Sequence, residues 1–403
     1  MADRIVVTSL GILSALGNGV DANLSALKKS EAGLRYTRHL QTVHSKDFLL
    51  GEVDQSNDDL SALLGLPSGD NGYTRTTLLA LIAVKEVMQG IEKDLLQNEG
   101  FAFINANTVG GMCSVENTYP DFLSDKTEGA FLKYIDTLDC AESTQHVIDY
   151  FDVTPFTATI STACSSSANA IILGARLIQQ GVVKRAICGG CDALSRFTLN
   201  GFNSLKNVDK EPCRPFDNTR FGLNLGEGAG YVLLETEKSA KERGAEIIAI
   251  LSGYGNTNDA YHPTAPSPNG DGAYNTMQLA LNNAGLQPSD INYINAHGTA
   301  TINNDSAEGK AIERLFENTV PYFSSTKPYT GHTLAAAGSI EAIFSIWALQ
   351  NEIIWPNLNF TTPMEDVSVR PITSLLENTH VRHTLSNSFG FGGNNVSLIF
   401  SKA

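Results

Sequence analysis

The sequence has no run of lysine and arginine and no long apolar segment. Only 18% of the 403 residues are charged, and the formal net charge is −15. Nucleic acids and anionic membranes are therefore poor partners, because both are bound through concentrated positive charge. No stretch approaches the ~20 apolar residues of a membrane-spanning helix. The N-terminal MADRIVVT has an acid and only a short apolar run, so it predicts a first strand instead of a signal peptide. We expect a cytoplasmic protein that contacts neither nucleic acid nor membrane.

Cysteine is scarce, and its pattern excludes two further classes of protein. Six cysteines in a chain of this length do not resemble a disulfide framework. The CxxC spacing at 188–191 could supply two zinc ligands, but the sequence has no second CxxC and no histidine pair to supply the other two. We therefore predict no zinc site. We interpret these two cysteines as small apolar residues at and just beyond the end of a buried strand. The sequence also lacks the G-x-S-x-G of a serine hydrolase.

Strand-like and helix-like segments alternate along the chain, which predicts an α/β layered fold. With 42% apolar residues the chain can bury a large core. Residues 31–74 are expected to be loops with short pieces of structure, and 108–150 an insertion with two helices. The expected strands are 5–10, 100–105, 156–162, 185–188, a strand ending at 235, 246–254, 291–295, 320–325, 384–389 and 396–401. The expected helices are 20–29, 75–91, 168–180, 239–243, 273–284, 305–316 and 335–350.

Cys164 lies in the stretch 160–171, ISTACSSSANAI, between an expected strand and an expected helix. The N–H groups at a helix N-terminus favour an anion, so we expect the pKa of this thiol to fall from ~8.5 into the range ~3.5–7.5. The serines at 165–167 are expected to satisfy free N–H donors of the helix. A lone cysteine is more often a buried structural residue, so its function depends on the rest of the chain.

Three glycine-flanked stretches supply further reactive groups: NAHGT with His297, KPYTGH with Lys327 and His332, and NSFGFGGNN with Phe391. Each follows or begins an expected strand or helix, where α/β folds bind ligands. A cysteine can carry an acyl group as a thioester, and two imidazoles can stabilise an enolate. Backbone N–H groups at Cys164 and in 390–394 could form an oxyanion hole. We expect Lys327 to lie next to His332 and to pair with Glu341, which would keep the histidine neutral. Each stretch alone is more often structural; together they indicate chemistry.

A similar unit occurs twice: a strand ending in Ser-Thr is followed by a reactive residue and a helix of small residues, first at Cys164 and again at His332. This repetition predicts a duplicated fold in which the two reactive groups meet.

The motifs TACSSS, NAHGT, KPYTGH and NSFGFGGNN, in this order and spacing, resemble those of β-ketoacyl-acyl carrier protein synthases of the elongating type. RPFD at 214–217, GEGAG at 226–230 and the loop 256–268 extend the resemblance over essentially the whole chain. The resemblance implies a thiolase-like five-layered α-β-α-β-α fold made of two similar halves. Residues 1–245 would carry the nucleophilic cysteine, and residues 246–403 the two histidines.

The resemblance also implies a reaction and partners. Cys164 would accept an acyl chain from acyl carrier protein, and His297 and His332 would promote decarboxylation of malonyl-acyl carrier protein. Lys327 would support the His332 site. Phe391 would gate the cysteine pocket, and its N–H would line the oxyanion hole. No metal or organic cofactor is expected, because the carrier brings its own pantetheine arm.

Some positions depart from the housekeeping pattern of that family. The region 60–75 has only Arg75 where a basic cluster for the carrier is common, and Asn394 stands where threonine is usual. Residues 220–228 and 331–334 are more similar to synthases of aryl-polyene or flexirubin pathways. Lys206 is a candidate carrier contact. We therefore consider two alternatives, a homodimer in fatty-acid elongation and a heterodimer with a non-catalytic chain-length factor.

Two other readings fit less well. Cys164 argues against a chain-length factor, which lacks the cysteine. A degradative thiolase would carry a second cysteine in 386–395, and none is present.

Overall fold

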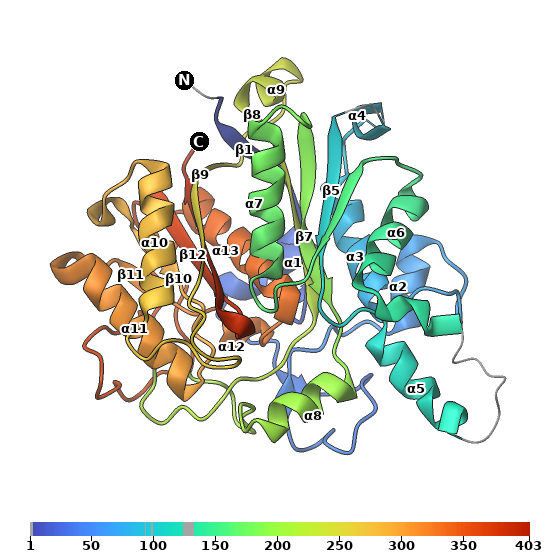
Figure 1. Cartoon of the computed structure of the whole chain (residues 1–403), viewed down its shortest axis with the longest axis horizontal. Helices are drawn as coiled ribbons and strands as arrows, with labels where there is room; N and C mark the ends of the chain where they lie inside the picture. The colour runs from blue at the N-terminus through green and yellow to red at the C-terminus, as the bar shows by residue number, and fades with distance from the viewer. Residues whose placement is uncertain (1–2, 93, 98–99, 124–132) are drawn as a thin grey trace.

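The computed structural model describes residues 3–92, 94–97, 100–123 and 133–403 (Figure 1). The strands are β1 (Ile5–Ser14), β2 (Gly17–Asn18), β3 (Arg35–Tyr36), β4 (Leu49–Leu50), β5 (Phe101–Ala106), β6 (Phe156–Ile160), β7 (Arg185–Asp192), β8 (Gly228–Thr236), β9 (Ala249–Asn258), β10 (Tyr293–Asn295), β11 (Tyr322–Ser324), β12 (His383–Phe389) and β13 (Asn394–Ser401). The helices are α1 (Val20–Lys28), α2 (Asn57–Leu64), α3 (Arg75–Val87), α4 (Asp94–Gln97), α5 (Met112–Leu123), α6 (Cys140–Phe151), α7 (Ser166–Gln179), α8 (Arg196–Ser204), α9 (Glu237–Glu242), α10 (Asp271–Ala284), α11 (Ile302–Phe316), α12 (Lys327–Thr330) and α13 (Ala337–Asn351).

The strand order repeats, which confirms the prediction of two similar halves. The large sheet runs β11-β10-β12-β13-β9-β1-β8-β7-β5-β6, with β2 paired to β1. Counted within each half, β6-β5-β7-β8-β1 and β11-β10-β12-β13-β9 have the same order, third-second-fourth-fifth-first. In both halves the outer pairings are parallel and the inner ones antiparallel. The halves join through β1 and β9, where Val6 is opposite Ile250.

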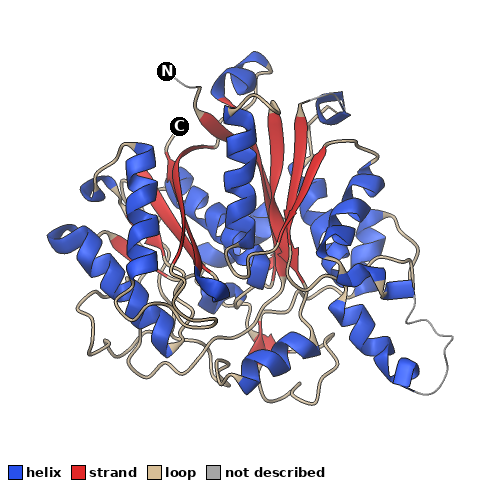
Figure 2. Cartoon of the chain, in the orientation of Figure 1, coloured by secondary structure: helices blue, strands red, loops and turns tan. Residues whose placement is uncertain are grey.

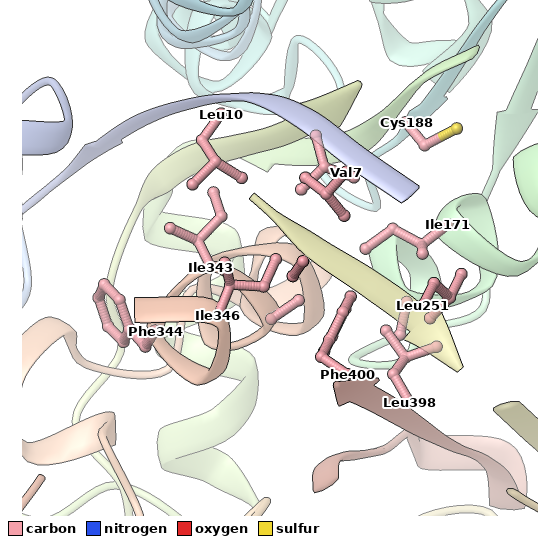
Figure 3. Close-up of a cluster of buried hydrophobic side chains, with 14 of the residues drawn as sticks. Val7, Leu10, Ile171, Cys188, Leu251, Ile343, Phe344, Ile346, Leu398 and Phe400 are labelled. Carbon is pink, nitrogen blue, oxygen red and sulfur yellow. The ribbon is translucent and has the colours of Figure 1, made fainter. Parts of the chain in front are cut away.

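Helices cover both faces of the strands and lie between the halves, giving five layers (Figure 2). Helix α3 packs on the outer face of β1, β7 and β8, and α10 packs on β9 and β13 with α11 beside it. Helices α7 and α13 form the middle layer (Figure 1). Three apolar cores fill the spaces between these layers, and Figure 3 shows part of the central one.

Successive side chains of a central strand such as β8 point alternately into two of these cores. On β8, Tyr231 and Leu233 face the core under α3, whereas Val232 and Leu234 face the central core. Because successive strand residues point to opposite faces, a strand buried on both sides has an almost continuous apolar sequence. This explains why the burial pattern of β8 shows buried residues throughout except at its last position.

The middle helices cross closely at their N-terminal ends. The N–H of Ser339 on α13 donates to Oγ of Ser167 on α7 at 2.9 Å. A Cβ at Gly338 would lie 2.9 Å from Cβ of Ala168, so only glycine permits this approach. The crossing brings together the two turns that carry Cys164 and His332.

Most of the expected elements are present, and several others were not predicted. Helix α8 was not predicted; it begins after Ser195, whose side chain accepts from the N–H of Thr198. Strand β7 extends to Asp192, so Cys191 lies inside it and not beyond its end. Residues 31–74 are loops with short pieces of structure, as expected; among them is helix α2, with a capping box formed by Ser56 and Asp59. The region 108–150 contains α5 and α6 as expected, and 124–132 lie outside the described residues. None of the described helices has both the length and the apolarity to cross a bilayer.

Candidate active site

Cys164 lies on a sharp turn between β6 and α7. Ala163 has a φ of 53°, in the left-handed region, and α7 begins at Ser166 with Ser165 as its N-cap residue. The three serines do not cap their own helix as expected. Ser165 makes no capping bond, Ser166 accepts from the N–H of Thr162, and Ser167 accepts from α13. They brace the turn and the helix crossing instead.

The expected low pKa of the Cys164 thiol is wrong. Burial raises this pKa to about 11, while the Lys327 ammonium and the Phe391 N–H oppose the rise. The sequence shows the favourable helix N-terminus, but the loss of water around the sulfur dominates. The resting group is therefore a thiol.

His332 lies beside this sulfur, with Nε2 3.0 Å from Sγ of Cys164. Its main chain is held on both sides by residues 224–226: its N–H donates to the carbonyl of Asn224 at 2.7 Å, and its carbonyl accepts from Gly226 at 2.9 Å. Among the described residues no partner faces its buried Nδ1. A buried N–H without an acceptor costs more free energy than a buried ring nitrogen without a donor. We therefore assign the ring hydrogen to Nε2, which faces the sulfur, and not to Nδ1.

His297 follows β10 and is positioned by a carboxylate that the sequence analysis did not single out. Glu308 on α11 accepts from the N–H of His297 at 2.9 Å and from the N–H of Gly298 at 2.8 Å. Asn387 on β12 donates to the same carboxylate at 3.0 Å. Burial raises the pKa of Glu308 to about 7. The available signal was an acid among small apolar residues on the inner face of the helix predicted at 305–316.

Lys327 contacts His297 directly, and its charge also lowers the pKa of His332 as expected. Its Nζ is 2.5 Å from Oε1 of Glu341, as predicted, and 3.4 Å from Nδ1 of His297. All three side chains are buried. An ammonium can only donate, so Nδ1 of His297 accepts and the ring hydrogen lies on Nε2. Burial raises the pKa of Glu341 to about 7, against the effect of Lys327.

Both imidazoles are neutral. Burial and then the Lys327 ammonium hold the pKa of His297 and of His332 well below the ordinary value. The two rings meet edge to face, with centroids 5.6 Å apart. The site therefore presents two neutral N–H donors beside a thiol.

Phe391 covers the cysteine from the loop between β12 and β13. Its N–H donates to the Cys164 sulfur, and its ring stacks on Phe202 of α8 at 5.5 Å. Cys164 and both aromatic rings line two cavities. The first, of about 220 Å³, also contains both histidines and Lys206. The second, of about 580 Å³, is mostly apolar and is lined by α8, Met112 and Leu334. The aromatic pair lies where a cavity lined by the two histidines meets a mostly apolar one.

Arg75, the single basic residue of the region 60–75, is not available to a partner. It is buried and pairs with Glu227 at 2.5 Å. Lys206, by contrast, is exposed beside the first cavity.

Cys164, His297 and His332 also offer one sulfur and two nitrogen atoms within 4.8 Å of one another. Such a donor set suits Zn²⁺, but the Lys327 ammonium beside His297 opposes a dication. The expectation that no metal is needed stays a prediction.

Two halves of equal topology that bring a cysteine and two histidines together define a condensing enzyme of thiolase-like fold. The family model "Beta-ketoacyl synthase, N-terminal domain" matches residues 2–240, and "Beta-ketoacyl synthase, C-terminal domain" matches 248–361. The chain therefore belongs to the β-ketoacyl synthase family, whose members are condensing acyltransferases.

Relatives and solved structures agree with this assignment. The chain is 33% identical over 412 aligned residues to 3-oxoacyl-[acyl-carrier-protein] synthase 2 of Staphylococcus aureus (strain COL), covering 99% of this chain and 98% of the relative. A ketosynthase in complex with its chain length factor from Xenorhabdus doucetiae has a TM-score of 0.87 at 32% identity, covering 100% and 98% of the two chains. The ishigamide ketosynthase/chain length factor has a TM-score of 0.92 at 28% identity over the full length of both chains.

Proposed function

We propose that this chain is a 3-oxoacyl-[acyl-carrier-protein] synthase that extends an acyl chain by two carbons. One observation carries the proposal: Sγ of Cys164 lies 3.0 Å from Nε2 of His332, with His297 edge-on to that ring, at the junction of two cavities. An acyl chain fits the mostly apolar cavity, and a malonyl thioester fits the cavity lined by both histidines.

In the first step the Cys164 sulfur attacks the thioester carbonyl of an acyl carrier protein. The N–H groups of Cys164 and Phe391 stabilise the oxyanion, and the positive end of α7 and the N–H of His332 stabilise charge on the sulfur. The carrier's C–S bond breaks, the acyl group is now on Cys164, and the thiol proton ends on the carrier's sulfur.

In the second step a malonyl thioester loses CO₂. Its carboxylate–methylene bond breaks, and the electron pair forms an enolate whose oxygen accepts from Nε2–H of His297 and of His332. Neutral donors suit this role, because they stabilise developing charge without protonating the carbon. The enolate carbon then attacks the acyl carbonyl on Cys164, the C–S bond breaks, and the released sulfur takes up a proton. None of these steps needs a cofactor beyond the pantetheine arm of the carrier.

The two candidate pathways differ in the partner subunit, which is either a second copy of this chain or a chain length factor. Within the described residues, strands β6 and β11 are the two edges of the large sheet, and Phe156 on β6 is 46% exposed. An exposed edge strand is a surface for pairing with another chain. The two neighbours that contain chain length factors support a heterodimer of the aryl-polyene or polyketide type; the Staphylococcus relative supports fatty-acid elongation. The division into halves at residue 245 and a cytoplasmic location remain part of this proposal.

Mass spectrometry of Cys164 tests the function. The purified protein, incubated with acyl carrier proteins that bear chains of different length, should gain the acyl mass on Cys164 and release a 3-oxoacyl product when malonyl carrier is added. Cys164→Ala should fold and form neither. His297→Ala and His332→Ala should lose malonyl decarboxylation. A Cys164→Ala protein that still elongates acyl carriers would refute the proposal.

A further inference from the structure

Asn394 lies at the end of the Phe391 loop and contacts the turn that carries the nucleophile. Its Oδ1 accepts from Oγ of Ser165 at 2.7 Å and from Nδ2 of Asn169 at 2.8 Å. Ser165 directly follows Cys164, and Asn169 is on the first turn of α7. Its carbonyl accepts from the N–H of Gly390 at 2.8 Å, which closes the loop.

Three asparagine side chains here donate to one another in a closed circle. Asn394 Nδ2 donates to Oδ1 of Asn256 at 3.5 Å, Asn256 Nδ2 donates to Oδ1 of Asn169, and Asn169 Nδ2 donates back to Asn394. The three residues come from the end of the Phe391 loop, from β9 and from α7. Each amide uses one donor and one acceptor in the circle, so each orientation depends on the other two.

We propose that this amide ring is a latch that holds the Phe391 loop closed over Cys164. The inference deepens the proposed function, because it names a device that controls access to the same cysteine. Asn394, Asn256 and Asn169 are positioning residues; they act through the placement of the Phe391 ring and N–H. Breaking the ring loosens the loop, because it removes the side-chain contacts that tie the end of the loop to α7 and β9. The backbone bonds from the N–H of Gly392 to Pro263 and from the N–H of Asp259 to Gly393 remain.

The latch predicts opposite effects on two steps. A freed loop exposes the sulfur more often, so Cys164 should react faster with a bulky reagent. The same freedom removes the Phe391 N–H from the oxyanion hole for part of the time, so condensation should slow. A general loss of structure would also expose the buried sulfur and slow condensation, so the thermal unfolding midpoint of each ring variant is measured alongside and should stay near that of the wild type.

The experiment compares Asn394→Ala, Asn256→Ala, the double variant and Asn282→Ala. Asn282 is the matched control, an exposed asparagine on α10 that bonds only Gln278 through its side chain. The rate of Cys164 modification by N-phenylmaleimide is read from the Cys164 peptide by mass spectrometry. We expect a five- to tenfold increase in both ring variants, no further increase in the double variant, and no change in the control. Turnover of acyl and malonyl carriers should fall about fivefold in the ring variants.

Non-additivity is the decisive result, because members of one ring act as a unit. Additive increases, or an unchanged alkylation rate in Asn256→Ala, would overturn the latch. Alkylation requires no acyl substrate, so it tests the latch even if the wild-type protein fails to condense carriers, which would refute the proposed function alone.

Discussion

Replacing Lys327 by methionine should raise the pKa of His297 and move the pH dependence of decarboxylation. The ammonium lies 3.4 Å from Nδ1 of His297 in a buried site. Two unit charges at this distance repel by about 5 kcal/mol at an effective dielectric constant of about 20. The charge of an imidazolium is spread over its ring, so we take about 3 kcal/mol, which corresponds to about two pKa units. Removing the positive charge of Lys327 favours the cationic form of His297, so the pKa of His297 should rise.

The assay is CO₂ release from malonyl carrier between pH 5 and 8. In the wild type both histidines stay neutral, because burial and Lys327 hold their pKa low. In Lys327→Met the loss of activity on the acid side should begin about two pH units higher. The rate at pH 8 should also fall, since nothing then keeps the hydrogen of His297 on Nε2.

The variant leaves Glu341 buried without its partner, which costs about 3–5 kcal/mol of stability. The double variant Lys327→Met/Glu341→Met is the matched control, because it removes both charges and keeps apolar bulk. It should regain most of the stability and keep the shifted pH profile. Profiles that superimpose on the wild type in both variants would refute the electrostatic role of Lys327.

Three further predictions follow from the same geometry. Because burial raises the pKa of Cys164 to about 11, its alkylation by iodoacetamide should increase about tenfold per pH unit from 7 to 10; a plateau below pH 8 would show a thiolate. Glu308→Gln replaces one of its two acceptor oxygens by an NH₂ donor that faces a backbone N–H, so unfolding should cost about 1–3 kcal/mol less and decarboxylation should fall about tenfold; normal decarboxylation would contradict its positioning role. Gly338→Val should overpack against Ala168 and lower stability by about 1–3 kcal/mol, whereas Gly201→Ala, in open space, should not.

Local pattern was sufficient for most of the elements and for the choice of candidate site residues. Strand and helix periods are properties of neighbouring residues, so β5, α7 and α13 could be predicted within a few residues. Glycine at 298 and 331 marks backbone with positive φ, which is also a local requirement. The four motifs therefore identified Cys164, His297 and His332 before any contact was known.

Contacts between distant segments could not be predicted in this way. Lys327 is five residues from His332 in the chain, yet its ammonium contacts His297, because α12 turns the side chain toward the end of β10. The amide ring joins residues 169, 256 and 394, which no local pattern connects.

The pKa of Cys164 shows the physical reason most clearly. The sequence alone determined that the thiol lies at a helix N-terminus, an interaction made within a few residues. Only the tertiary structure decided how much water reaches the sulfur, because Phe391 and His332, which lie against it, come from the other half of the chain. Desolvation depends on all of these at once, so the local sequence places the thiol at a helix N-terminus, while the fold around it determines its pKa.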